Sequence, residues 1–327
     1  MPDKGRIRAL ILLLLKGLLV AVIFTVIFVR TDTDAMFFRL VNVSVCPLLA
    51  ALLLFWLNRI LTAVKWSLLL KHNNINAEFK SLVRIMFESS FIGLAIPSGL
   101  GPDIIRLIQI RTHKHDLTLA AGSVLADRMM AILSLALLSG ISAAICLQFI
   151  EDKTVVAAVL ATAFALTAVI MGLMTPLSTR ILKSDRTGNH ETESGTGIPE
   201  KLRRIHNSFA GLLKCPAVFM LVLAVNIVVQ LVRIAQAFLL FVALGNLIPV
   251  ISVAAFYPMI LLVKLLPFVP FMGLGVQEGA FAYFFHQVGV SPETAVSASL
   301  LNHLIVIAGL IPGAALFLSR KRKDDRK

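Results

Sequence analysis

The chain has 327 residues, of which 58% are hydrophobic and only 15% are charged. Soluble domains contain roughly 45–50% apolar residues, so this composition excludes an ordinary water-soluble enzyme. The formal net charge is +13, but the basic residues are spread over the connections between apolar blocks. This distribution argues against a nucleic-acid partner and is typical of cytoplasmic loops of a membrane protein.

Six apolar blocks approach the roughly 20 residues that a helix needs to cross a bilayer. In chain order they are Ala9–Val29, Val41–Leu57, Met129–Ile150, Val155–Met174, Pro216–Leu244 and Ala295–Leu318. The first block is long and lacks a small-residue cleavage site, so we expect a retained helix and not a signal peptide. The three cysteines have no paired spacing; we therefore expect no disulfide, metal site or cofactor.

Lysine and arginine cluster in five stretches, which hold 3, 5, 3, 7 and 6 of these residues in turn. The stretches are Lys4–Arg8, Arg59–Arg84, Arg106–Lys114, Arg180–Lys214 and Arg320–Lys327. The positive-inside rule predicts that all five are cytoplasmic. We therefore expect a multi-pass protein of a bacterial-type cytoplasmic (inner) membrane, with both termini in the cytoplasm.

Two apolar segments cannot be simple spans if these stretches share one side. Ile85–Ile96 lies between two basic stretches, and its roughly 12 residues would extend only about 18 Å of a core about 30 Å thick. We predict a re-entrant hairpin that turns at Pro97–Pro102. Val250–Phe285 is interrupted by three prolines, which predicts a second hairpin that enters from the opposite side and turns near Phe271–Gly275.

The two predicted turns have similar sequences. Each contains a proline, then Gly-Leu-Gly, then an acidic residue; the matching turn residues are Pro97, Gly99 and Gly101 in the first and Pro270, Gly273 and Gly275 in the second. Ser123–Arg128 likewise resembles Ala298–His303, at nearly the same separation along the chain. We predict an all-α fold of about six spans and two hairpins in an inverted-topology repeat, with halves 1–150 and 151–327 in one membrane domain.

Ionisable side chains at membrane depth are costly and indicate a functional site by default. Besides Glu88, the predicted substrate-binding residues are Asp103, Arg106, Asp127, Arg128, Arg233, Lys264, Glu278 and His303. Asp103 and Arg106 are three residues apart on a helix and can pair on one face. We expect Glu278 to pair with Arg233 or Lys264. A snorkelling role for Arg128 and a structural hydrogen bond for His303 are the alternatives.

The segment Gly273–Glu278 reads Gly-Leu-Gly-Val-Gln-Glu and resembles the signature of the lysylphosphatidylglycerol synthase transmembrane region, or flippase-like domain, family. Pro97–Arg106 and the Asp127-Arg128 pair are similar to the first-half signature of that family, and the Lys65-Trp66 pair resembles its basic-residue–Trp pattern. The resemblance implies a membrane protein that moves a lipid or lipid-linked head group between leaflets.

Two positions depart from the family pattern. At His303 the family often has Arg, and at Met272 it commonly has a second small residue. The sequence ends at Lys327 without a soluble aminoacyl-transferase domain. We therefore expect a stand-alone member that does not synthesise lysyl lipid.

Three functions are open at this point. The first is a non-enzymatic flippase for an anionic or phosphate-bearing lipid, because basic side chains suit phosphate. The second is a membrane-embedded enzyme that uses Asp103, Asp127 and Glu278. The third is an accessory subunit that binds a partner enzyme through a cytoplasmic loop at about 178–214.

Overall fold

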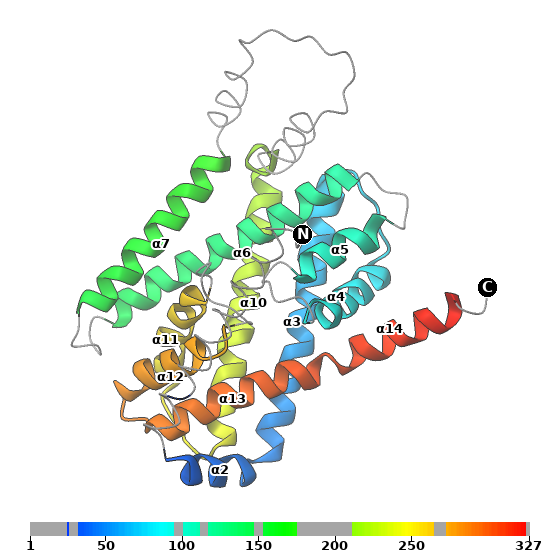
Figure 1. Ribbon diagram of the computed structural model, residues 1–327. Coiled ribbons are helices and arrows are strands. Elements are labelled where there is room, and N and C mark those ends of the chain that lie inside the picture. Colours follow the sequence, from blue (N-terminus) through cyan, green and yellow to red (C-terminus); the bar gives the residue numbers. More distant parts are fainter. Residues whose placement is uncertain are drawn as a thin grey trace, which may run out of the picture.

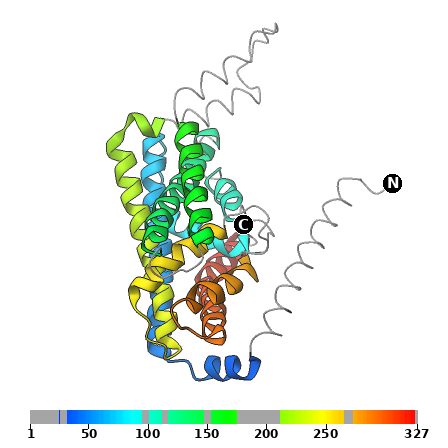
Figure 2. The same cartoon turned by 90° about the vertical axis from the view of Figure 1, so that its left-hand side faces the viewer.

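A computed structural model describes residues 32–94, 101–111, 117–146, 153–174, 211–264 and 273–324, together with Thr25. All regular structure in these ranges is helical (Figures 1 and 2). The helices are α2 (Thr33–Val41), α3 (Val45–His72), α4 (Phe79–Gly93), α5 (Gly101–Arg111), α6 (Leu117–Cys146), α7 (Lys153–Met174), η1 (Gly211–Lys214), α10 (Pro216–Ala243), α11 (Val250–Val263), α12 (Val276–His286), α13 (Pro292–Gly309) and α14 (Ile311–Asp324).

Five described stretches are long and apolar enough to cross a membrane: α3, α6, α7, α10, and Pro292–Ser319 across α13 and α14. Large apolar side chains on their outer faces are exposed, including Phe164 at 77% and Leu53 at 60%, as lipid-facing surfaces require. The all-α membrane fold is thus confirmed, and five of the six predicted spans correspond to these stretches. The first predicted span, and nearly all of the predicted loop at 178–214, lie outside the described residues.

Helix α3 corrects one part of the charge analysis. The predicted second span ended at Leu57, whereas α3 continues without a break to His72. Arg59 and Lys65, counted as loop charges, therefore lie within a 28-residue helix. The prediction failed because it treated every basic residue as a loop marker, although the apolar sequence continues on both sides of Lys65.

The helices α3 and α10 pack extensively on each other and lie side by side along one side of the molecule (Figures 1 and 2). α6 packs on α7 and α11 on one side, and α4 and α5 pack together beside α3 on the other. α12 packs on α13, which also contacts α2, α3 and α10. Segments from both halves of the sequence therefore pack against the α3–α10 pair.

The helices at the two predicted hairpins are too short to span. α4, α5, α11 and α12 have 15, 11, 14 and 11 residues, or about 16–22 Å at about 1.5 Å per residue. They form two pairs, α4–α5 and α11–α12, at the places where the sequence predicts hairpins. The re-entrant path remains a prediction, and the turn residues Pro97, Gly99 and Pro270 lie outside the described residues.

Glycines allow the ends of these short helices to meet. A Cβ on Gly93, the last residue of α4, would lie 2.6 Å from the pyrrolidine Cγ of Pro102 in α5. Gly273 and Gly275, before α12, have φ angles of 89° and 82°, which L-residues with a side chain rarely adopt. In the second half of the chain, the two glycines of the Gly-Leu-Gly motif thus allow a backbone turn with positive φ angles before α12.

Candidate functional site

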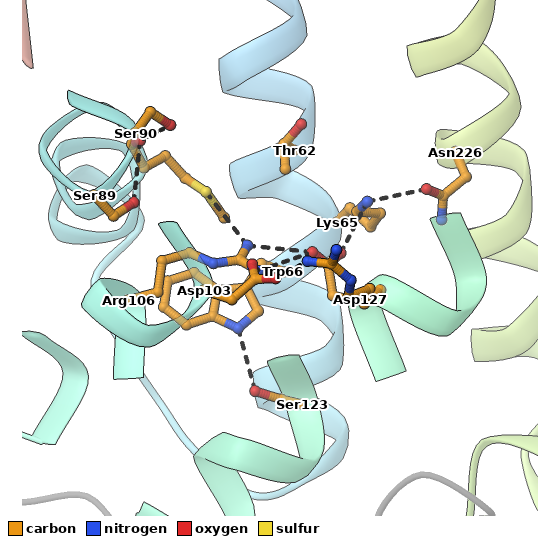
Figure 3. Close-up of polar contacts among 12 residues, drawn as sticks. Thr62, Lys65, Trp66, Ser89, Ser90, Asp103, Arg106, Ser123, Asp127 and Asn226 are labelled. Atoms are coloured by element: carbon orange, nitrogen blue, oxygen red, sulfur yellow. Dashed lines mark hydrogen bonds and ion pairs between the residues drawn. The ribbon is translucent and has the colours of Figure 1, made fainter. Parts of the chain in front are cut away.

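A cavity of about 300 Å³ lies between α3, α4, α5, α6 and α10. Serine, threonine and amide side chains line part of it, and Thr62, Ser89, Ser90 and Asn226 are seen around its charged residues in Figure 3. The ionisable residues that line it are Arg59, Lys65, Arg106, Arg128, Arg233, Asp103 and Asp127. Five cations face two carboxylates, so the wall carries an excess of three positive charges.

Asp127, on α6, is the centre of a buried ion-pair network (Figure 3). Its Oδ1 atom lies 2.9 Å from Lys65 Nζ, and its Oδ2 atom accepts hydrogen bonds of 3.2 Å from both Nη1 and Nη2 of Arg106. The Lys65 ammonium also donates to Asn226 Oδ1 of α10 at 2.9 Å. The network therefore ties α3, α5, α6 and α10 together through side chains that are buried.

Trp66 supports this network with its ring. The Arg106 guanidinium lies over the indole, 5.1 Å from the ring centroid, in a cation–π contact. The indole N–H donates to Ser123 Oγ at 3.2 Å, and the Trp66 side chain is fully buried. The Arg106 side chain is thus held between Asp127 and a fixed aromatic ring.

Asp103 connects the short helix α5 to α6. It lies in the first turn of α5, where a carboxylate interacts favourably with the helix dipole. Its Oδ1 atom is 2.7 Å from Arg106 Nη2, as the i,i+3 spacing suggested, and its Oδ2 atom is 2.5 Å from Arg128 Nη1. Arg128 thus lines the cavity and forms an ion pair with Asp103.

Arg59 and Arg233 differ from the other three cations because neither forms an ion pair within the described residues. Arg59 Nη1 donates to Ser90 Oγ at 3.2 Å and its guanidinium lies over the Phe55 ring. Arg233 Nη1 reaches Gln230 Oε1 at 3.5 Å. The charges of Arg59 and Arg233 also repel each other. An anion between them would relieve this repulsion and use their remaining donors.

A second polar cluster lies apart from the cavity, where α11, α12 and α13 meet. The fully buried Glu278 carboxylate accepts hydrogen bonds from the Gly275 backbone N–H at 2.6 Å and from Ser299 Oγ at 3.0 Å. His303 Nε2 lies 2.9 Å from Glu278 Oε1. The basic side chain at ion-pair distance from Glu278 among the described residues is therefore His303 of α13, and not Arg233 or Lys264 as the sequence led us to expect.

Lys264 belongs to the same cluster through an amide. Its ammonium donates to Gln277 Oε1, and Gln277 Nε2 donates in turn to Ser299 Oγ at 3.0 Å. A chain of contacts thus runs from Lys264 through Gln277 and Ser299 to Glu278.

The predicted site residues therefore fall into two groups. Asp103, Arg106, Asp127, Arg128 and Arg233 line the cavity, whereas Lys264, Glu278 and His303 form the second cluster. Among the described turn residues, Gly101 begins α5 and is buried, and Gly273 and Gly275 precede α12.

Sequence reasoning missed Arg59 and Lys65 as cavity residues. The run from Ile60 to Leu70 could have indicated them. It is too apolar for a loop, and Lys65 is its only charged residue. Asn226 was also missed, since a single amide in an apolar helix gives no indication of its partner.

Comparison with known proteins decides the family. The family described as the lysylphosphatidylglycerol synthase TM region matches residues 13–313 of this chain. The chain belongs to this family. The predicted family is thereby confirmed, and the chain is a multi-pass membrane protein.

A curated relative extends the comparison. The UPF0104 membrane protein PH1989 of Pyrococcus horikoshii is 22% identical over 299 residues, which cover 84% of this chain and 87% of that protein. The similarity therefore applies to the membrane domain as a whole and not only to the Gly-Leu-Gly segment.

Proposed function

We propose that this protein moves an anionic, phosphate-bearing lipid or lipid-linked head group between the leaflets of a bacterial-type inner membrane, without covalent chemistry. The observation that carries the proposal is the cavity wall, where five cations face two carboxylates. Charged groups at membrane depth are costly unless they are paired. An excess of three positive charges is best accounted for by an anionic substrate.

Arg59 and Arg233 are the residues that we expect to contact the phosphate. They come from α3 and α10, face one cavity and have no carboxylate partner in the described part of the chain. Arginine binds phosphate oxygens with two parallel N–H donors, which a lysine cannot do. The pairs made by Asp103 and Asp127 would keep the remaining cations in position.

The repeated arrangement supports a transporter. Asp103 and Glu278 are separated along the chain by the same interval as Arg128 and His303, and each acid pairs with the base of its own half. The interval between Arg59 and Arg233 is nearly the same. Inverted repeats with short, interrupted helices are typical of transporters in which the halves expose one site alternately to either side.

Reconstituted vesicles test the proposal. Fluorescent phosphatidylglycerol and phosphatidylcholine are placed in both leaflets, and the fraction accessible to a membrane-impermeant quencher is followed over time. We expect the protein to accelerate movement of the anionic lipid, and Arg59→Ala or Arg233→Ala to lower the rate about tenfold or more, since a hydrogen bond to a charged group contributes about 1.5–3 kcal/mol.

Lys71→Ala is the matched control, because Lys71 is an exposed cation on the same helix as Arg59. It should leave the rate unchanged. Absence of protein-dependent movement of any lipid would contradict the proposal. A change in the mass of the lipid would instead identify a membrane-embedded enzyme.

A further inference from the structure

The pair formed by Glu278 and His303 has a geometry suited to proton binding. The Glu278 carboxylate is fully buried, and all its partners hold it in one orientation: the Gly275 N–H, Ser299 Oγ and His303 Nε2. The His303 side chain keeps 15% of its surface exposed. His303 Nε2, which faces the carboxylate, is itself buried, so an incoming proton would bind at Nδ1, the ring nitrogen that does not face Glu278.

The equivalent pair of the first half cannot bind a proton in this way. Asp103 pairs with Arg128 at 2.5 Å. The separation from Asp103 to Glu278 in the sequence equals the separation from Arg128 to His303. A guanidinium stays protonated in proteins, whereas an imidazole changes its charge between about pH 5 and 8. The same position thus carries a permanent charge in one half and a titratable one in the other.

Contacts lead from this pair toward the cavity. Ser299 and Gln277 connect Glu278 to Lys264. Lys264 in turn lies within electrostatic range of both Glu278 and Arg233, and Arg233 lines the cavity. We therefore expect a change of charge at Glu278 and His303 to alter the field at the cavity wall, because Coulomb interactions extend beyond contact distance.

Other charged or titratable groups lie on the helices around this path in the described part of the chain. Tyr257 of α11 packs its ring edge-on against Phe281 of α12 and interacts electrostatically with Arg233. The helices packed against α13 carry further charged or titratable residues: Asp34 and Arg39 of α2, Arg59, Lys65, Lys71 and His72 of α3, Arg233 of α10, Tyr283 and His286 of α12, and Arg320–Asp324 of α14; α13 itself carries Glu293. His303 is thus the titratable partner in direct contact with Glu278.

We propose that Glu278 and His303 form a proton-binding site that couples proton uptake to binding of the anionic head group in the cavity. With a neutral imidazole and an ionised carboxylate the pair carries one negative charge, and one proton taken from water makes it neutral. Loss of that negative charge strengthens the positive field from Lys264 and Arg233, so the anion binds more tightly. Linkage is reciprocal, so a bound anion favours proton uptake, and anion and proton would cross together.

This inference rests on the proposed function, and a binding measurement separates the two. The probe is dihexanoyl phosphatidylglycerol, whose phosphodiester keeps one negative charge over the range used. Binding to the purified full-length protein in detergent is measured at pH 5.5 and pH 8. We expect wild-type affinity to be about five- to tenfold higher at the lower pH, within the usual range of coupling between sites.

His303→Arg is the decisive variant, because it keeps a cation beside Glu278 but removes the titration. Its affinity should be the same at both pH values. His286→Arg introduces the same change at an exposed histidine on α12 and should retain the wild-type pH dependence. In vesicles with the membrane potential clamped, an imposed pH gradient should drive lipid movement by wild type and by His286→Arg, but not by His303→Arg.

The outcomes distinguish the two proposals. Equal wild-type affinity at both pH values, or pH-dependent binding that persists in His303→Arg, would overturn the proton site even if lipid moves. pH-dependent binding that His303→Arg abolishes, without any lipid movement, would retain the proton site and reject translocation. No binding at either pH would overturn both.

Discussion

The two halves of this protein place an acid on a short helix and a base on the following long helix, but they use the pair differently. In the first half, Asp103 and Arg128 are part of the cavity wall, next to Asp127 and its two buried cations. In the second half, Glu278 and His303 lie apart from the cavity, and Asn302 takes the place before His303 that Asp127 takes before Arg128.

The exchange of Asp127 for Asn302 replaces a charged side chain with a neutral amide. Asn302 Oδ1 accepts a hydrogen bond of 3.1 Å from Gln236, where the first half has a carboxylate between Lys65 and Arg106. The position of Asp127, a carboxylate between two cations, thus corresponds to an amide that binds another amide in the second half. The comparison teaches that positions separated by one interval in the sequence hold similar acid–base pairs in different surroundings; in our proposals the first pair serves ligand binding and the second serves proton binding.

The strongest test of this comparison is Asp127→Asn, which gives the first half the amide of the second. Lys65 and Arg106 would lose a shared counter-ion while both stay buried. Removing one partner of a buried ion pair costs about 3–5 kcal/mol, and we expect a loss of that size in the free energy of unfolding, measured by denaturation in mixed micelles. Asp34→Asn, at an exposed acid on α2, should change it little. A loss below about 1 kcal/mol, far under the usual cost of breaking a buried pair, would show that the network does not depend on this charge.

A smaller effect is expected from Gly273→Ala in the turn before α12. The φ angle of 89° disfavours a side chain, and the new Cβ would meet the aliphatic chain of Lys264. Backbone strain of this kind costs about 1–3 kcal/mol, so the melting temperature should fall. Gly279→Ala, on α12 itself with open space around the added Cβ, should be neutral or stabilising. Equal melting temperatures for the two variants would refute a structural role for the first Gly of the motif.

The smallest effect is expected from Arg128→His, which gives the first half the titratable base of the second. As pH rises from about 6 to 8 the imidazole loses its charge, so one cation leaves the cavity wall. Affinity for dihexanoyl phosphatidylglycerol should fall a few-fold over this range, measured by the same binding assay. Arg128→Lys retains the charge and should lack this additional pH response. A pH profile of Arg128→His equal to that of Arg128→Lys would show that the base at this position does not act on the ligand.

Much of the fold was predictable because a bilayer imposes a length on apolar segments. The apolar blocks predict α7 and α10 to within a few residues, whereas α6 begins well before its block, at Leu117. The Asp103–Arg106 pair was also predictable, since its partners are three residues apart on one helix. These are local features, which spacing along the sequence can report.

Contacts between distant segments were not predictable. Lys65 and Asp127 lie on different helices, far apart in the sequence, and nothing in either local sequence indicates the other. Glu278 was expected to pair with Lys264 or Arg233 on charge alone, whereas helix packing brings His303 to its carboxylate. Arg59 was misplaced because a count of basic residues does not distinguish a loop from the interior of a long helix.

The contact between Arg106 and Trp66 places a fluorescent side chain next to a cavity residue. The chain contains two tryptophans, and the other, Trp56, donates its indole N–H to the Gly309 carbonyl at the α3–α13 contact. With Trp56→Phe, the remaining indole emission comes from the ring beneath the Arg106 guanidinium. We expect this emission to change when a ligand in the cavity displaces Arg106 from the ring, because Arg106 lines the cavity and contacts the indole.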